Sequence, residues 1–174
     1  MPSTIRRLNP GDAHAWARLR QEALETCPLT FGASLPDEFN ALVETAGDRL
    51  EVREDSAFFG AFVNNALIGT IGIHRDSGAK RRHKCGIVAM FVRSGNRRSG
   101  VGALLVKAAI QHARSWEGME QVQLVVNDVA PEAKRLYESN GFRTWGVEPR
   151  SLRHAGRYTD ATHMILHLRE RETT

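Results

Sequence analysis

The stretch of sequence that decides the fold reads Met90-Phe91-Val92-Arg93-Ser94-Gly95-Asn96-Arg97-Arg98-Ser99-Gly100-Val101-Gly102. An apolar run here enters a short basic loop that contains glycine, and the chain then continues as an amphipathic helix. Backbone N–H groups at the start of a helix have no partner, and the helix dipole is positive there. Glycine also lets a ligand approach the backbone closely. The segment is therefore typical of a site for a phosphate or pyrophosphate, with Arg97 and Arg98 adding positive charge at its mouth.

Two familiar phosphate-binding motifs do not fit this loop. A Walker A loop ends in Gly-Lys-Ser/Thr, whereas Gly100 is followed by Val101. A dinucleotide fingerprint needs a third glycine after Gly102, whereas the chain continues with Ala-Leu-Leu. An ordinary turn from strand to helix, with arginines that face water, is an equally good interpretation of the loop when it is taken alone.

A second informative segment begins with the apolar run Leu-Val-Val-Asn at residues 124–127 and continues as a helix. Tyr137 lies on the apolar face of that helix, in line with Ala133 and Leu136. Taken alone, it is most simply a core tyrosine whose hydroxyl has a partner. The functional interpretation is a proton donor at a buried site.

The motif Arg97-x-x-Gly100-x-Gly102 is followed downstream by Ala133-x-x-Leu136-Tyr137-x-x-x-Gly141-Phe142. Together the two resemble the GNAT superfamily of acetyl-CoA-dependent N-acetyltransferases, and the resemblance extends over about residues 4–168. It implies the α/β (α+β) class, with a mixed, mostly antiparallel sheet flanked by helices and a splayed parallel strand pair at the cofactor site. Residues 1–174 are expected to form a single N-acetyltransferase domain.

The resemblance also implies roles for particular residues. The pantetheine arm of acetyl-CoA would lie between strands over residues 85–92 and 121–126. Backbone groups of Met90 and Val92 would bond the pantetheine and the acetyl carbonyl, and amides from Arg97 to Gly102 would hold the pyrophosphate. A fixed backbone N–H would polarise the thioester carbonyl, and Tyr137 would be the catalytic acid that protonates the leaving thiolate. The expected cofactor-binding residues are Met90, Phe91, Val92, Arg97, Arg98, Ser99, Gly100, Val101, Gly102 and Asn127.

The sequence departs from the family pattern in two places. Ala130 stands where the family often has asparagine, and Asn127 is the candidate for the missing polar contact. No carboxylate lies between Cys85 and Val92, where some members keep a general base. The base therefore stays open among Asp37, Glu38, His74, His83 and an ordered water.

Three features near the C-terminus allow more than one interpretation. Trp145 faces either the core or the acceptor cleft, and Tyr158 and Asp160 are candidates for lining the acceptor pocket. His163 and His167 share strand parity, but no third ligand is evident, so no metal site is expected.

The rest of the chain alternates between strand and helix patterns. We expect strands over residues 4–8, 57–63, 67–74, 85–92, 121–126, 142–147 and 162–168, with a tight turn at Asn64-Asn65-Ala66. One helix is capped by Asp12 and stopped by Pro28, and a second covers residues 38–50. A third helix is closed by Asn140-Gly141. A further helix is expected to place on one face Val101, Leu104, Leu105, Ala108 and His112.

Length and composition agree with a single globular domain, since the chain has 174 residues of which 41% are hydrophobic. A net charge of +4 permits an anionic ligand but does not make nucleic acid the expected partner. No apolar run approaches the ~20 residues of a membrane-spanning helix, and no secretory signal is evident, so we expect a cytoplasmic protein without a membrane partner. Cys27 and Cys85 are far apart and are expected to be free thiols.

The expected activity is transfer of the acetyl group of acetyl-CoA to a primary amine of a small molecule or of a protein or peptide N-terminus. A polyamine, an amino-acid-like amine and an antibiotic amine all remain open as acceptors, and so does a homodimer through the final strands. One alternative is a non-catalytic acyl-CoA-binding module or sensor, motivated by Ala130 and the missing base. Another is a module that binds RNA or protein through Lys80-Arg81-Arg82-His83-Lys84.

Overall fold

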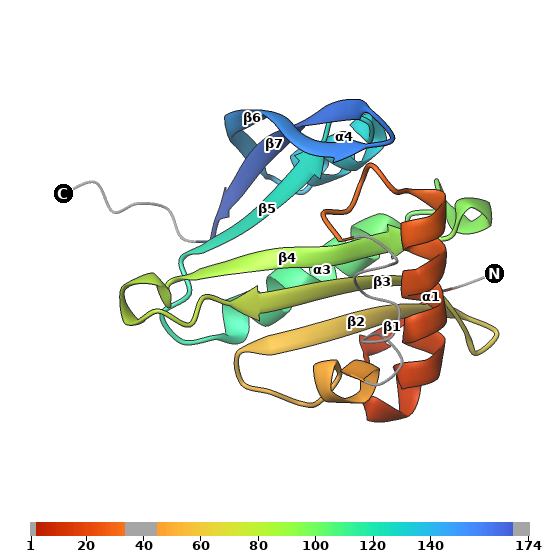
Figure 1. Ribbon diagram of the computed structural model, residues 1–174. Helices are drawn as coiled ribbons and strands as arrows, with labels where there is room; N and C mark the ends of the chain where they lie inside the picture. Colours follow the sequence, from red (N-terminus) through yellow and green to blue (C-terminus); the bar gives the residue numbers. More distant parts are fainter. Residues whose placement is uncertain (1–2, 34–44, 169–174) are drawn as a thin grey trace.

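Seven strands form one sheet with helices on both of its faces (Figure 1). The computed structural model describes residues 3–33 and 45–168. The helices are α1 (Ala13–Thr26), α3 (Val101–Ser115) and α4 (Pro131–Ser139), and residues 45–49 are also helical. The strands are β1 (Thr4–Arg7), β2 (Ser56–Val63), β3 (Ala66–Arg75), β4 (Lys84–Val92), β5 (Gln121–Asn127), β6 (Arg143–His154) and β7 (Arg157–His167).

The strand order is β1-β2-β3-β4-β5-β7-β6. Strands β4 and β5 are parallel, and every other neighbouring pair is antiparallel. A parallel pair needs a crossover connection, and α3 provides it between β4 and β5. The predicted mixed, mostly antiparallel sheet flanked by helices is therefore confirmed.

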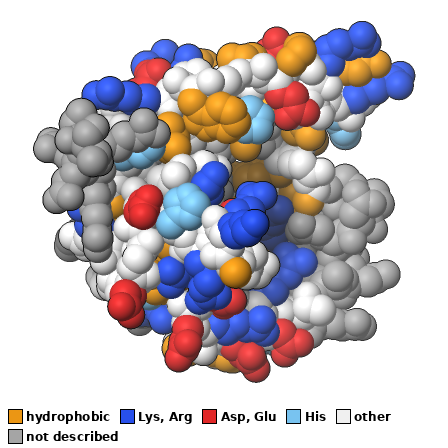
Figure 2. All heavy atoms as spheres, turned by 90° about the vertical axis from the view of Figure 1, so that its left-hand side faces the viewer, with side chains coloured by type: hydrophobic (Ala, Val, Ile, Leu, Met, Phe, Trp, Pro, Cys, Tyr) orange, Lys and Arg blue, Asp and Glu red, His pale blue; other side chains and the backbone are white. Residues whose placement is uncertain are grey.

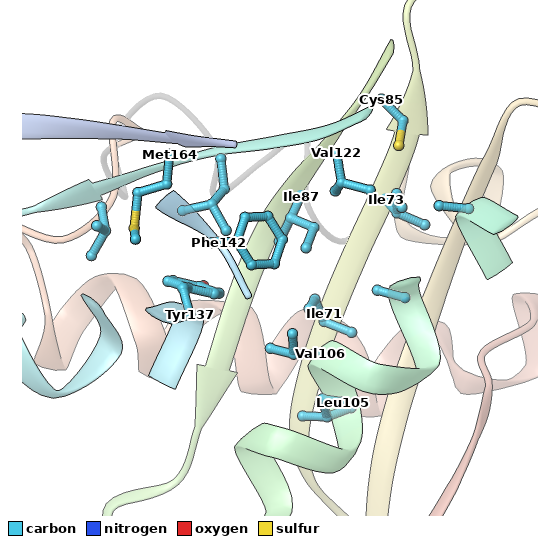
Figure 3. Packing of buried hydrophobic residues seen from close by; sticks show 14 of the residues in the cluster. Ile71, Ile73, Cys85, Ile87, Leu105, Val106, Val122, Tyr137, Phe142 and Met164 are labelled. Atoms are coloured by element: carbon cyan, nitrogen blue, oxygen red, sulfur yellow. The ribbon is translucent and has the colours of Figure 1, made fainter. Parts of the chain in front are cut away.

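Two apolar clusters hold the helices to the two faces of the sheet. Leu105 and Val106 of α3 are fully buried against Ile71 of β3, and the same cluster continues to α4 (Figure 3). On the opposite face, Trp16 and Leu19 of α1 are fully buried in a second cluster. This apolar burial is the main source of stability for each layer.

Two short connections follow the turn chemistry that the sequence predicts. Asn64 and Asn65, between β2 and β3, have φ values of 48° and 64°, which asparagine tolerates in a two-residue hairpin turn. Gly141, with a φ of 91°, ends α4 as the predicted left-handed cap. Both predictions are confirmed.

The start of α1 differs from the prediction. The side chain of Asp12 makes no capping hydrogen bond to α1. Its carboxylate accepts two hydrogen bonds from Arg6, at 2.8 and 2.7 Å, and one from the backbone N–H of Asn9, at 3.0 Å. A 3-10 turn at residues 10–12 precedes the helix, and the side chain that caps this turn is that of Asn9. The hydrogen bond from Arg6 lowers the pKa of Asp12.

The phase of α3 was also predicted incorrectly. Leu104 is 43% exposed, and Ala108 is only half-buried. The buried face is turned by about one position, because the helix packs on both the sheet and α4. Its buried residues are Val101, Leu105, Val106, Ala109 and Ala113.

Strands β6 and β7 are much longer than the runs 142–147 and 162–168 that the sequence predicts, because they extend to a turn at Ala155 and Gly156. Tyr158 and Asp160 therefore lie within β7 and not in a loop before it. Much of β6 is exposed, so no alternating apolar pattern marks its outer half. Part of the predicted helix over 38–50 lies outside the described residues.

The two cysteines and the lengths of the helices can also be compared with the sequence-based expectations. Cys27 is half-buried and Cys85 is buried, and both are free, as predicted. Among the residues that the structure describes, no helix is long and apolar enough to cross a membrane.

Candidate functional site

The parallel strands β4 and β5 are paired over less than half their length. Lys84, Cys85 and Gly86 pair with Gln121, Val122 and Gln123, and no later residue of the two strands is paired with the other. Figure 1 shows the two strands diverging beyond this point. The splay that the resemblance implies is present.

A bulge on β4 accounts for the divergence. Val88 pairs with Gly72 of β3 and Phe91 pairs with Thr70, so two residues of β4 oppose one residue of β3. One of the two, Ala89, has a φ of 52°, in the left-handed region that alanine rarely adopts. An extra residue bends and twists its strand, which turns the end of β4 away from β5.

The divergence opens a groove of about 530 Å³ on the face of the sheet that carries α1. Figure 2 shows this hollow, with hydrophobic side chains and a histidine on one side of it and several Lys and Arg side chains on the other. Its walls come from β4, β5, the β6–β7 hairpin and the segment after α1. The lining residues include Phe31, His74, Asp76, Arg81, Val88, Ala89, Val125, Asn127, Trp145 and His163.

The loop before α3, residues 93–100, keeps backbone N–H groups available at the start of the helix. Leu104 donates the first backbone hydrogen bond of the helix, to the carbonyl of Gly100, so the preceding N–H groups have no partner within the helix. Gly100 has a φ of 83° and Arg98 a φ of 61°, which curves the loop around these groups. With the exposed Arg98 beside them, they can hold an anion.

The two predicted cofactor residues Arg97 and Ser99 use their side chains to shape this loop. Arg97 donates from Nε to the carbonyl of Val92 at 2.9 Å, and Ser99 donates from Oγ to the carbonyl of Asn96 at 2.7 Å. The backbone N–H of Arg97 also donates within the loop, to the carbonyl of Ser94 at 3.3 Å. What Ser99 can offer a ligand is therefore chiefly its backbone N–H group, and what Arg97 can offer is a nearby positive charge.

Close packing explains why residue 102 is a glycine. A Cβ at this position would lie 3.0 Å from Cδ2 of Leu136 on α4 and 3.4 Å from Cε of Met90 on β4. The glycine therefore lets α3 approach both α4 and the end of β4 closely. Phe91, next to Met90, points the other way and is buried in the α1 cluster.

Tyr137 is buried on the far side of the sheet from the groove. Its ring meets Phe142 edge-on at 5.8 Å between ring centres, and Figure 3 shows it near Met164. It shares an apolar cluster with Ile87 and Leu124, two residues that also line the groove. Burial raises the pKa of Tyr137, so its hydroxyl keeps its proton at neutral pH.

Asn127 joins the end of β5 to the segment after α1. Its Nδ2 donates to the carbonyl of Thr30 at 2.9 Å. Its Oδ1 is buried and has no hydrogen-bond partner among the described residues. Ala130, which replaces the usual asparagine, begins α4 without a side-chain cap.

The candidate general bases are placed differently from one another. His74 lines the groove, whereas His83 is not among the lining residues that the structure describes. Asp37 and Glu38 lie outside the described residues. Trp145 faces the groove, but Tyr158 and Asp160 do not line it in the described part of the chain.

Sequence reasoning missed several groove residues. Nothing in the sequence marks Ala89 as the site of a bulge, because alanine has no preference for a positive φ. Phe31 is not singled out by any motif, and Arg81 is noted only as part of the basic run at residues 80–84. Glu148, which contacts the groove residue His163, is not singled out either. A partial signal existed for Trp145 and His163, since both were singled out and their strand parity could be counted.

Comparisons with known proteins agree with this geometry. The sequence pattern of the acetyltransferase (GNAT) family matches residues 16–142. A mycothiol acetyltransferase of Thermobispora bispora is 44% identical over 52 residues, which are 30% of this chain and 17% of that protein. The matched segment thus spans less than a fifth of that relative.

Two solved structures share the fold over nearly the whole chain. An acetyltransferase of the GNAT family from Streptococcus pneumoniae superposes with a TM-score of 0.83 at 22% identity, covering 96% of this chain and 100% of that one. YncA from Salmonella typhimurium, solved with its cofactor acetyl-CoA, superposes with a TM-score of 0.82 at 20% identity, covering 100% and 98%.

A mostly antiparallel sheet that opens between two parallel strands, beside a glycine loop at the start of a helix, defines an acetyltransferase fold. This chain belongs to the GNAT family of acetyltransferases.

Proposed function

We propose that this chain transfers the acetyl group of acetyl-CoA to a primary amine of a small molecule or of a protein or peptide N-terminus. Residues 1–174 would act as one N-acetyltransferase domain. The observation that carries the proposal is the β4–β5 divergence with an anion-binding loop at its open end. Acetyl-CoA is also the cofactor of the similarly folded YncA.

The chain offers acetyl-CoA two kinds of contact. The N–H groups of residues 98–102 and the side chain of Arg98 suit the pyrophosphate, whereas the N–H of Arg97 donates to the carbonyl of Ser94. The end of β4, at Met90, Phe91 and Val92, is not paired with β5, so backbone groups there can serve the pantetheine arm, except the carbonyl of Val92, which accepts from Arg97. Asn127, with its unpaired Oδ1, is placed at the opposite strand to accept one further hydrogen bond.

The chemistry required of the chain is modest. Acetyl-CoA supplies the acetyl group, and the amine nitrogen bonds to its carbonyl carbon while the carbon–sulfur bond breaks. A fixed backbone N–H on β4 stabilises the charge on the carbonyl oxygen without reorganising. Tyr137 holds a proton for the leaving sulfur. Since an ordinary thiol has a pKa of ~8.5, and burial raises the pKa of Tyr137, this transfer depends on close placement of the hydroxyl.

The test is a calorimetric titration of the full chain with acetyl-CoA, followed by an amine panel scored by CoA release. Arg98→Glu places a negative charge at the loop and is expected to weaken binding at least ~10-fold, because it repels the pyrophosphate. Lys107→Glu makes the same change on the exposed side of α3 and is the matched control, with near-normal binding.

Three outcomes separate the functions. Binding together with CoA release for any amine supports the acetyltransferase. Binding without release for every amine leaves the non-catalytic sensor as the better description. No binding by the folded wild type overturns both and returns attention to the basic run at residues 80–84.

A further inference from the structure

His163 on β7 is held in the wall of the groove by two neighbours on β6. Its Nε2 lies 3.3 Å from Oε2 of Glu148, and its ring lies 5.3 Å from that of Trp145, with 53° between the ring planes. The side chain of His163 is 28% exposed, and it lines the groove. An imidazole fixed by a carboxylate on one nitrogen presents its other nitrogen in a defined direction.

Other charged and titratable side chains of the groove make different contacts. Asp76 accepts a hydrogen bond from Arg81 at 2.8 Å, so these two lining residues form an ion pair. His74 is exposed and lies over Gly86, where its Cε1 is 3.0 Å from the position of a Cβ. Arg20 lies over the ring of Phe31, at 4.8 Å from its centre. Of the described groove-lining histidines, His163 is therefore the one with a carboxylate partner.

The groove surface around His163 is apolar. Val88 of β4, Val125 of β5 and Trp145 of β6 are 40%, 54% and 60% exposed, and all three line the groove. Val125 is the β5 residue paired with His163. An apolar surface disfavours a charged ammonium group, so an amine that binds here gives up its proton more readily than in water.

An amine acceptor needs such a proton transfer. A free alkylamine has a pKa near that of lysine, ~10.4, so it is mostly protonated at neutral pH and has no lone pair for attack. A histidine has an ordinary pKa of ~6.5 and can accept a proton at physiological pH. The groove joins His163 to Ala89, at the bulge where β4 leaves β5.

We propose that His163 is the general base of this acetyltransferase and that Glu148 is its positioning residue. The inference rests on the proposed function. A proton passes from the ammonium group of the acceptor to Nδ1 of His163, while Nε2 stays directed at Glu148. The neutral amine then forms the N–C bond and the C–S bond breaks. The thiolate takes the proton of Tyr137, the second proton that the nitrogen loses on becoming an amide returns to the Tyr137 oxygen, and His163 releases the first proton to solvent.

The experiment measures CoA release by the full chain with acetyl-CoA and a panel of arylalkylamines, aliphatic diamines, L-amino acids and a peptide with a free N-terminus. His163→Asn is expected to lower kcat about 100-fold near neutral pH. The deficit should shrink as the pH approaches the pKa of the amine used, ~10 for an alkylamine and ~8 for a peptide N-terminus, because solution then supplies the neutral amine. Glu148→Gln should give a smaller deficit with the same pH trend.

His167→Asn is the matched control, since it makes the same substitution on β7 at a histidine that is not among the described groove-lining residues, and it should leave turnover within about 2-fold. Calorimetry with acetyl-CoA checks that each variant is folded, and His163→Gln gives a second variant if His163→Asn does not fold. A deficit of His163→Asn that is independent of pH overturns the proposal. So does turnover close to wild type in both His163→Asn and His163→Gln. In either case the assignment of acetyltransferase activity is unaffected. If the wild-type chain releases no CoA with any amine of the panel, the proposed acetyltransferase activity and the role of His163 both fail.

Discussion

The two halves of the β4–β5 pair have opposite properties. In the closed half, Cys85 and Val122 are paired across the strands and are 2% and 0% exposed. In the open half, Val88 and Val125 are 40% and 54% exposed and line a groove. The change occurs within a few residues, at the bulge of Ala89.

The difference shows how one strand pair serves both the core and the site. The closed half removes apolar surface from water and fixes the two strands in register. The open half leaves backbone hydrogen-bonding groups and apolar side chains without partners from the neighbouring strand. Such groups are costly in a fold and useful in a binding site. Substitutions in the open half, and in residues facing it, should therefore change function more than stability.

The largest effect is expected for Tyr137→Phe. This variant tests the β4–β5 opening from the face of the sheet opposite the groove. The variant removes one hydroxyl and keeps the ring against Phe142, so the free energy of unfolding should change little. Turnover with acetyl-CoA and an accepted amine should fall about 100-fold, because the leaving thiolate loses its proton donor. Calorimetry should show acetyl-CoA affinity within about 2-fold of wild type.

Unchanged turnover in Tyr137→Phe would remove this residue from the acid role and leave it as a core tyrosine. Phe142→Leu is the matched control, because it alters the same ring contact without touching the hydroxyl. That variant should lose stability and keep turnover per folded molecule.

A smaller effect is expected for Trp145→Ala, which tests the groove side of the opening. Trp145 and Val147 are both 60% exposed on β6, but of these two described residues only Trp145 lines the groove. Trp145→Ala should raise the KM for the amine about 10-fold, since a large aromatic contact is lost. Acetyl-CoA affinity should not change.

Val147→Ala removes equally exposed apolar surface outside the groove and is expected to have no effect on KM. Equal effects of the two substitutions would show that the acceptor does not contact the groove wall. Steady-state kinetics with varied amine at saturating acetyl-CoA separates the two outcomes.

The sequence predicts the cofactor side of this opening better than the acceptor side. The loop at residues 93–100 is built from backbone, and backbone sites need glycine and a helix start at fixed spacing, which leaves a readable motif. Tyr137 can be singled out from the sequence for a related reason, because it falls on an apolar helix face beside a glycine cap, and its role stays a prediction.

The groove is lined by residues of five strands, of α1 and of two connecting segments, so its residues have no common spacing in the sequence. Trp145 and His163 are brought together only by the register of β6 with β7, which includes a bulge beside Trp145. The outer halves of β6 and β7 were missed because an exposed edge hairpin shows no alternating apolar pattern. The bulge at Ala89 depends on long-range pairing with β3, which no local propensity predicts.

The smallest effect is expected in the closed half, at Cys85, and appears as a pH dependence of stability. Burial first, and then the nearby Asp76 carboxylate, raises the pKa of the Cys85 thiol to about 12. A thiol in the unfolded chain has a pKa of ~8.5. The unfolded state therefore loses this proton first, so the stabilisation is complete below pH ~8.5 and declines as the pH rises.

One pH unit above the ordinary thiol pKa, this loss should be about 1 kcal/mol. Cys85→Ala removes the titrating group, so its free energy of unfolding should fall less steeply with pH than that of wild type. Chemical denaturation between pH ~8 and ~10 measures the slope. Unfolded tyrosine, with a pKa of ~10, begins to ionise at the upper end of this range, but it does so equally in wild type and in Cys85→Ala. Cys27→Ala, which removes the half-buried thiol, is the matched substitution. A wild-type slope in Cys85→Ala would mean that water reaches the closed half, and the contrast between the two halves would then be weaker than their exposed fractions indicate.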